Sequence, residues 1–193
     1  MVKNIIITGG LGYIGTELCK IYSGVSWHHK ITVIDNRFIS ERVNQIRNWN
    51  MNFVHGDILD KDLVNKYFKN ADIVHHLAGI TDVPRTKSES SKARDEKIKL
   101  VGEEGTQNIL NAISNECKII FPSTHVVYEG IEKVKNDIGE EEDVKPVLSY
   151  SSSKAINEKQ LKNSGKNYVI LRLGSVYGYS TDTTRIDIMP NLF

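Results

Sequence analysis

The chain has 193 residues, and 25 Lys and Arg against 24 Asp and Glu give it a formal net charge of +1. This length suits one domain with a sizeable core, and so small a charge gives no electrostatic drive toward nucleic acid. Its apolar runs fall well short of the roughly 20 residues that span a membrane. The first run is also too short for a signal peptide. We therefore expect a cytoplasmic protein with no nucleic-acid or membrane partner.

Short apolar runs alternate with longer amphipathic stretches along the chain. The runs are continuously apolar, as in strands buried on both faces, and they lie at 5–8, 31–35, 52–55, 73–77, 118–122 and 168–173. The stretches predict helices at 13–22, 40–49, 61–68, 93–115 and 150–163, with polar surface loops at 85–92 and 130–145. This alternation predicts an α/β fold: a Rossmann-type, doubly wound parallel sheet with helices on both faces.

The first predicted strand leads into a glycine-rich sequence. Gly9, Gly12 and Gly15 stand at the point where the strand should turn into a helix. Such a turn lets the backbone approach a pyrophosphate, whose charge the N–H groups of the helix N-terminus then bind. By itself the pattern is also compatible with a purely structural corner. Its place between a strand and a helix favours a dinucleotide site.

Carboxylates follow the second and third predicted strands. Asp35 lies 20 residues after Gly15, where it can accept hydrogen bonds from the adenosine-ribose hydroxyls and repel a 2′-phosphate. This favours NAD, although Arg37 keeps NADP open because a guanidinium can accommodate that phosphate. Asp57 and Ile58 offer a carboxylate and an apolar side chain where adenine would lie. Asp57 is also a candidate cap for the next helix.

Two further groups have the chemistry of proton transfer. Tyr150 and Lys154 stand four residues apart, on one face of a predicted helix, so the ammonium can favour the phenolate of a tyrosine that is otherwise a poor base. Considered alone, Tyr150 and Lys154 are more simply interpreted as an ordinary pair of surface side chains. Thr124 ends the fifth predicted strand, where open parallel sheets bind ligands, and its hydroxyl can contact a substrate oxygen. His125 is an alternative acid–base, but its apolar neighbours favour a packed side chain.

Metal and disulfide chemistry are not indicated. His75 and His76 are adjacent in a predicted strand, so they face opposite ways, and no third ligand is spaced nearby. Cys19 and Cys117 form neither a CxxC pair nor a metal spacing. We expect no metal site, and we expect both cysteines to be buried free thiols.

Together, these motifs resemble the NAD-dependent epimerase/dehydratase family, the extended short-chain dehydrogenases/reductases in which sugar-nucleotide epimerases are prominent. The resemblance covers essentially the whole chain and depends on the order and spacing of several motifs. These are Thr8-Gly9-Gly10-x-Gly12-x-x-Gly15, Asp35, Gly56-Asp57-Ile58, His76-Leu77-Ala78-Gly79, Gly105-Thr106-x-Asn108, Ser123-Thr124, Tyr150-x-x-x-Lys154 and Leu171-Arg172.

The resemblance implies an NAD-dependent sugar-nucleotide epimerase, similar to UDP-glucose 4-epimerase, that acts by transient hydride transfer through a keto intermediate. In such an enzyme, Tyr150 is the catalytic base, and Lys154 is its partner and binds the nicotinamide ribose. Thr124 and Ser175 contact the substrate. It also implies a homodimer formed through 93–115 and 150–163. The implied cofactor contacts are Gly9, Gly12, Tyr13, Ile14, Gly15, Asp35, Asn36, Asp57, Ile58, Leu77, Ala78, Gly79, Thr81, Ser123, Tyr150 and Lys154.

Some positions depart from the family pattern. His125 and Val126 stand where the family's 4,6-dehydratases have an Asp-Glu pair, which disfavours elimination, while Gly102 replaces a usual asparagine and Glu129 a usual glycine. The alternatives are a dehydrogenase or reductase of a small alcohol or carbonyl, using NAD or NADP, and a non-catalytic NAD-binding sensor or scaffold.

Domain limits follow from the resemblance as well. We expect the NAD-binding domain with its catalytic residues to span 1–178, and 179–193 to begin a substrate lobe that is largely absent. For this reason we expect weak turnover of sugar nucleotides by these 193 residues alone.

Overall fold

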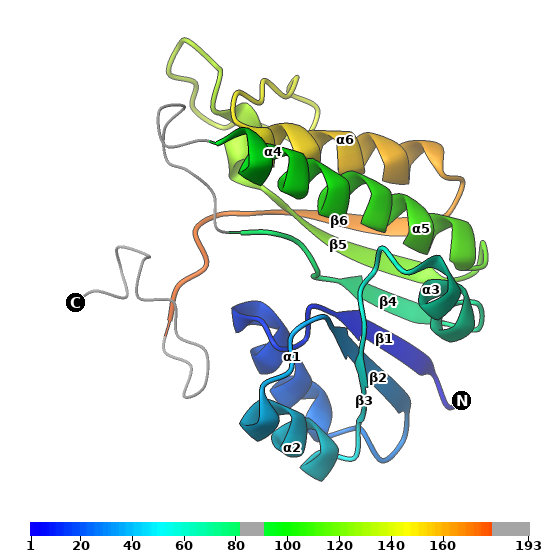
Figure 1. Cartoon of the computed structure of the whole chain (residues 1–193). Coiled ribbons are helices and arrows are strands. Elements are labelled where there is room, and N and C mark those ends of the chain that lie inside the picture. Colours follow the sequence, from blue (N-terminus) through cyan, green and yellow to red (C-terminus); the bar gives the residue numbers. More distant parts are fainter. Residues whose placement is uncertain (82–90, 179–193) are drawn as a thin grey trace.

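The computed structural model describes residues 1–81 and 91–178, so the expected start of a substrate lobe at 179–193 lies outside the described residues. The described residues form a six-stranded parallel sheet, as predicted, and the strand order is β3-β2-β1-β4-β5-β6 (Figure 1). Its strands are β1 (Asn4–Thr8), β2 (Lys30–Asp35), β3 (Asn52–His55), β4 (Ile73–His76), β5 (Lys118–Thr124) and β6 (Asn167–Leu173).

Helices cover both faces of this sheet (Figure 1). They are α1 (Tyr13–Ser23), α2 (Ser40–Asn48), α3 (Lys61–Phe68), α4 (Lys92–Lys99), α5 (Gly105–Ala112) and α6 (Ser149–Asn163). Ile5 and Ile7 of β1 pack with α1 and α2, whereas Ile6 packs with α3, α5 and α6. Because alternate side chains of one strand enter separate cores, the doubly wound arrangement is confirmed.

The predicted helix at 93–115 is confirmed over most of its length, but it is not α-helical throughout. Between α4 and α5 the chain forms a π-helical segment, Leu100–Glu104, and α5 already ends at Ala112. Two carbonyl groups of this segment accept from side-chain amides of α6: Asn157 donates to Gly102 at 3.0 Å and Gln160 to Glu103 at 3.1 Å. A Cβ on Gly102 would lie 2.4 Å from the hydroxyl of Ser153, so the glycine allows α6 to pack this closely.

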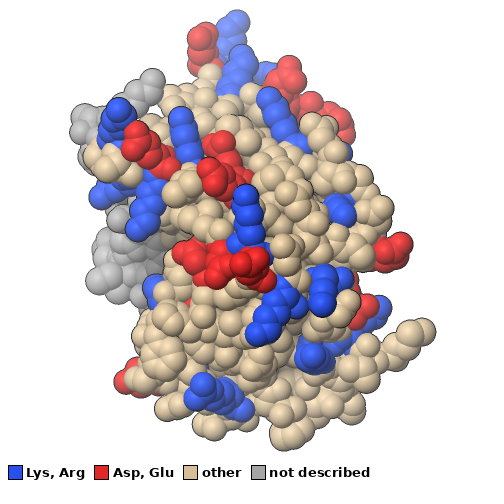
Figure 2. All heavy atoms as spheres, turned by 45° about the vertical axis from the view of Figure 1, so that its right-hand side comes forward, with Lys and Arg blue, Asp and Glu red and all other residues tan. Residues whose placement is uncertain are grey.

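Within the described residues no helix combines the length and the apolar character needed to cross a membrane. On the face that Figure 2 shows, Lys and Arg side chains are interspersed with Asp and Glu, so charge of one sign does not gather there. Cys19 and Cys117 are free and buried, as predicted.

Gly9 forms the corner between β1 and α1. Its φ is +67°, and a Cβ at this position would lie 2.8–2.9 Å from backbone atoms of Leu77 and Ala78, just after β4. Side chains rarely adopt such a φ, and backbone atoms cannot move aside cheaply. Only glycine therefore allows the two strand ends to approach each other this closely.

A comparison of two glycines separates these effects. Gly165 has a similar φ of +68° but open space around its Cβ position. We expect Gly165→Ala to lower the free energy of unfolding by about 1 kcal/mol, and Gly9→Ala, which adds a backbone clash, to lower it by about 3 kcal/mol. Equilibrium denaturation in urea measures both values. Equal losses in the two variants would show that the close approach at Gly9 does not matter.

Candidate active site

The predicted site residues follow the carboxyl ends of the strands, which meet at one edge of a parallel sheet. The glycine-rich turn follows β1, Asp35 ends β2, and Asp57 follows β3. Leu77, Ala78, Gly79 and Thr81 follow β4, Ser123 and Thr124 end β5, and the exposed Ser175 follows β6. The structure therefore brings residues that are far apart in the sequence to one edge.

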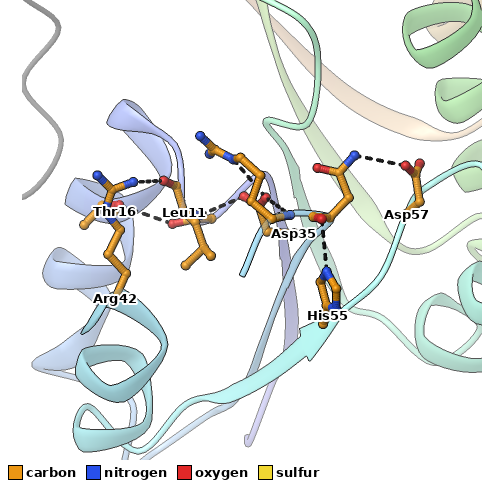
Figure 3. A network of polar contacts seen from close by, with 9 residues as sticks. Leu11, Thr16, Asp35, Arg42, His55 and Asp57 are labelled. Carbon is orange, nitrogen blue, oxygen red and sulfur yellow. Dashed lines mark hydrogen bonds and ion pairs between the residues drawn. The ribbon is translucent and has the colours of Figure 1, made fainter. Parts of the chain in front are cut away.

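Asp35 connects the glycine-rich turn to β2 (Figure 3). Its side chain is 4% exposed and accepts hydrogen bonds from the backbone N–H of Leu11 and of Arg37, both at 2.9 Å. The Arg37 guanidinium lies 3.3 Å from the same carboxylate, and Arg42 donates to the Leu11 carbonyl at 2.6 Å. The turn is thus fixed from both sides by α2 and β2. Arg37, the residue that keeps NADP open, is held beside the carboxylate that favours NAD.

Asp57 lies beside the end of β2. One of its oxygens accepts from the Asn36 side chain at 2.9 Å (Figure 3), and the other accepts from the Leu59 N–H at 3.0 Å. The cap of α3 is Asp60, which accepts from the N–H groups of Asp62 and Leu63. The alternative that Asp57 caps this helix is therefore wrong, and Asp57 and Asn36 form one polar pair at the site edge.

Ile58 packs into the core beside the loop that carries Asp57, and its contact with adenine stays a prediction. Its side chain is only 4% exposed and belongs to the core with α3 and α5. A Cβ on Gly105 would lie 2.4 Å from its Cδ1, so α5 packs directly on it. The side-chain amide of Asn108 also donates to the Ile58 carbonyl, at 3.1 Å. Ile58 and Asn108 thus hold the loop that carries Asp57.

His76 supports the ends of β1 and β4 from inside the protein. Its ring nitrogens lie 3.0 Å from the hydroxyls of Thr8 and Thr106, and Thr8 also accepts from the Ala78 N–H at 3.0 Å. Burial, with the nearby charge of Lys154, lowers the pKa of His76 to about 3, so the ring is neutral at physiological pH. It fixes the backbone on which the cofactor contacts Ala78 and Gly79 are predicted.

The two adjacent histidines face opposite sides of the sheet, as predicted. His75 lies 2.8 Å from the Tyr22 hydroxyl of α1, on the face opposite to that of His76 and Thr106. Among the described residues, no group of three or more His, Cys, Asp or Glu side chains could hold a metal ion.

The end of β5 presents neighbouring side chains to opposite faces. The Ser123 hydroxyl donates to Glu158 of α6 at 2.6 Å, so this side chain is occupied within the protein, and a cofactor contact by Ser123 stays a prediction. The Thr124 hydroxyl accepts from the Val126 N–H at 3.3 Å. The expectation that His125 is packed among apolar neighbours is wrong: it is exposed and donates to the Leu173 carbonyl at 3.2 Å.

Tyr150 and Lys154 lie in the first two turns of α6, on one face as predicted. The Lys154 ammonium is 5.9 Å from the Tyr150 ring centroid and 4.3 Å from that of Phe121, and it donates to the Pro122 carbonyl at 2.8 Å. Burial lowers the pKa of Lys154 to about 8, an effect that the negative charge of Glu158 opposes. The pair therefore combines a phenol with an ammonium whose charge depends on pH near neutrality.

The start of α6 is held by Glu129. One oxygen of this carboxylate accepts from the N–H groups of Val147 and Leu148, both at 2.7 Å, and from the Ser151 hydroxyl. A negative charge at a helix N-terminus is stabilising. This positioning role was not predicted, and its only sequence signal is the departure from glycine at this position.

The start of α1 faces a shallow groove. Tyr13 and Ile14 line it together with Val176, Tyr177 and Gly178, and the Tyr13 hydroxyl donates to the Gly178 carbonyl. Ile14 is partly exposed. Contacts of Tyr13 and Ile14 with the cofactor remain predictions.

Comparison with known proteins agrees with this geometry. The model of the NAD dependent epimerase/dehydratase family matches residues 5–191. The chain belongs to this family. It is 30% identical to dTDP-D-glucose 4,6-dehydratase of Dictyostelium discoideum, over 92% of this chain and 44% of that protein. It is 28% identical to UDP-glucose 4-epimerase of Neisseria meningitidis serogroup C, over 86% of this chain and 49% of that one.

A solved structure is similar as well. UDP-glucuronic acid 4-epimerase from Bacillus cereus, in complex with UDP-glucuronic acid and NAD, has a TM-score of 0.76 and 27% identity, covering 97% of this chain and 60% of that one. The chain spans about half the length of the curated relatives it matches.

Proposed function

We propose that this family member is the NAD-binding and catalytic part of a sugar-nucleotide epimerase that acts on a UDP-sugar. One observation carries the proposal: Tyr150 and Lys154 on α6 lie with Thr124 of β5 at the sheet edge that also holds the glycine-rich turn. The UDP-sugar epimerases among its relatives and structural neighbours support the same substrate class. Residues 1–178 form the proposed cofactor domain.

The described residues fit NAD. The turn at Gly9 has no room for a side chain, and its neighbouring N–H groups at the start of α1 suit a pyrophosphate. The buried carboxylate of Asp35 lies beside the turn, where it suits ribose hydroxyls. Arg37, which is paired with Asp35, leaves NADP as the second candidate cofactor.

The proposed chemistry divides proton and hydride transfer between partners. Tyr150 takes the proton of a substrate hydroxyl, and Lys154 favours the phenolate through its positive charge while holding the nicotinamide ribose. Thr124 contacts the substrate oxygen. NAD, which the glycine-rich turn and Asp35 would hold, would supply the hydride acceptor for the substrate and the hydride donor for the transient ketone. The substrate is thereby epimerised without net oxidation.

Epimerisation is favoured over dehydration by the side chains after Thr124. His125 and Val126 offer no carboxylate there. The next carboxylate along the chain, Glu129, accepts three hydrogen bonds at the start of α6, so it is not free to act as an acid. Elimination with the help of such an acid is therefore not proposed.

Replacing the proposed base tests the mechanism. We expect Tyr150→Phe to lower substrate-driven reduction of bound NAD and formation of the epimer by at least about 100-fold, because the acceptor of the proton is lost. Its affinity for NAD should stay within about twofold of wild type. The measurements are absorbance of the bound cofactor and product analysis with a panel of UDP-sugars, and Tyr67→Phe on α3 is the matched control.

Other outcomes point to the other functions. Full activity in Tyr150→Phe would contradict the assigned base. In the wild type, reduction without an epimer product would indicate a dehydrogenase or reductase of an alcohol or carbonyl. NAD binding with no turnover of any substrate would indicate a sensor or scaffold.

We also propose a homodimer in the cytoplasm. The buried free thiols of Cys19 and Cys117 suit a reducing compartment. The helix layer of α4 to α6 leaves two large apolar side chains exposed, Leu100 at 43% and Ile156 at 38%. A second copy that packs on this layer would cover them.

Sedimentation velocity of three proteins tests the dimer. We expect the wild type to be a dimer and Leu100→Glu/Ile156→Glu to be a monomer, since the two carboxylates would be buried without partners. The control, Ile21→Glu, changes an exposed isoleucine of α1 on the opposite face and should remain a dimer. A dimeric double variant, or a monomeric wild type, would contradict this interface.

A further inference from the structure

A buried polar network lies one helical turn beyond Lys154. Glu158 is only 3% exposed, and both of its carboxylate oxygens are engaged. Ser123 donates to one oxygen at 2.6 Å, and Arg172 donates from Nε to the same oxygen at 3.0 Å and from Nη2 to the other at 2.7 Å. Arg172 also donates to the Tyr128 hydroxyl. The carboxylate thus joins α6 to β5 and β6.

The network holds the strand segment on which Lys154 rests. Three consecutive residues of β5 are involved: the Pro122 carbonyl accepts from Lys154, Ser123 is bound to Glu158, and Thr124 is the proposed substrate contact. A shift of this segment would move the acceptor of the ammonium and the substrate contact together.

We propose that Glu158 is a positioning residue, which clamps the end of β5 and acts through Lys154 to set the charge and the place of that ammonium. Its importance for catalysis rests on the proposed function, in which Lys154 holds the nicotinamide ribose and favours the phenolate of Tyr150. Glu158 itself touches neither substrate nor cofactor in this account.

Electrostatics agree with the geometry. Burial alone would raise the pKa of Glu158, but hydrogen bonds from Arg172 and Ser123, with the charges of Arg172 and Lys162, bring it below its usual value. The carboxylate is therefore charged at neutral pH. Its charge raises the pKa of Lys154, which burial lowers to about 8.

Several other groups surround the ammonium. Tyr150 precedes Lys154 on α6, and the ring of Phe121 lies beneath it from β5. His76 of β4 also interacts with the Lys154 charge, and its pKa is about 3, so it carries no charge near neutrality. Of the charged groups that face Lys154 from the described residues, Glu158 supplies the negative charge, and Arg172 lies behind it.

Without the carboxylate, the charged form of Lys154 is less stable, so the ammonium should lose its proton at a lower pH. We expect Glu158→Gln to move the titration midpoint of Lys154 down by about one pH unit. The alkaline limb of the pH–activity profile should move in the same direction, with kcat changing more than KM.

The titration can be read in the protein without cofactor. The experiment follows the Cε resonance of Lys154 by NMR in protein labelled at lysine, with Lys154→Arg identifying the signal. The matched control is Glu142→Gln, which removes a carboxylate from the exposed ion pair with Lys135 elsewhere in the chain. An unchanged control midpoint with a lowered midpoint in Glu158→Gln would support the proposal.

A second variant guards against loss of folding. Glu158→Gln leaves the partly buried Arg172 without its carboxylate partner, whereas Glu158→Gln/Arg172→Gln removes both charges and should be tolerated better. The double variant should show the same direction of shift. A folded variant with the wild-type midpoint, or unfolding of both variants, would overturn the proposal, the latter by showing a role in stability alone.

These outcomes are separate from failure of the proposed function. A wild-type protein that does not bind NAD would contradict the function but leave the NMR titration interpretable. A protein that binds NAD and epimerises, yet shows no effect of Glu158 on Lys154, would contradict only this inference.

Discussion

The close approach between the glycine corner after β1 and the backbone after β4 sets the geometry on which the rest of the site depends. Gly9 has no side chain to keep Leu77 and Ala78 away, and Thr8 binds both the Ala78 N–H and the buried ring of His76. The carboxylate of Asp35 then fixes the same turn from β2. Backbone contacts thus fix this edge of the sheet before any ligand binds, which lowers the entropy cost of binding.

Much of this could be predicted from the sequence, because the decisive signals are local. Continuous apolar runs indicate parallel strands, and glycine spacing indicates the turn, so the parallel sheet and the edge carrying Asp35 follow from general rules. The four-residue spacing of Tyr150 and Lys154 similarly places both on one face of α6. These features can be predicted without knowing how α6 packs against the rest of the protein.

The features that sequence alone did not reveal depend on packing between distant segments. The π-helical segment packs closely against α6 at Gly102, and Ile58 packs closely against Gly105 of α5. Glu158 has only one signal in the sequence, its position four residues after Lys154. Its binding to Ser123 and Arg172 emerges only when β5 and β6 lie side by side.

The central claim is that the turn at Gly9 and the carboxylate of Asp35 form a site for NAD. Isothermal titration calorimetry of this chain with NAD and with NADP tests it most directly. The account predicts one NAD per chain, bound at least about tenfold more tightly than NADP, with this preference reduced in Asp35→Asn because the repulsion of a 2′-phosphate is lost. No binding of NAD, or tighter binding of NADP by the wild type, would contradict the account.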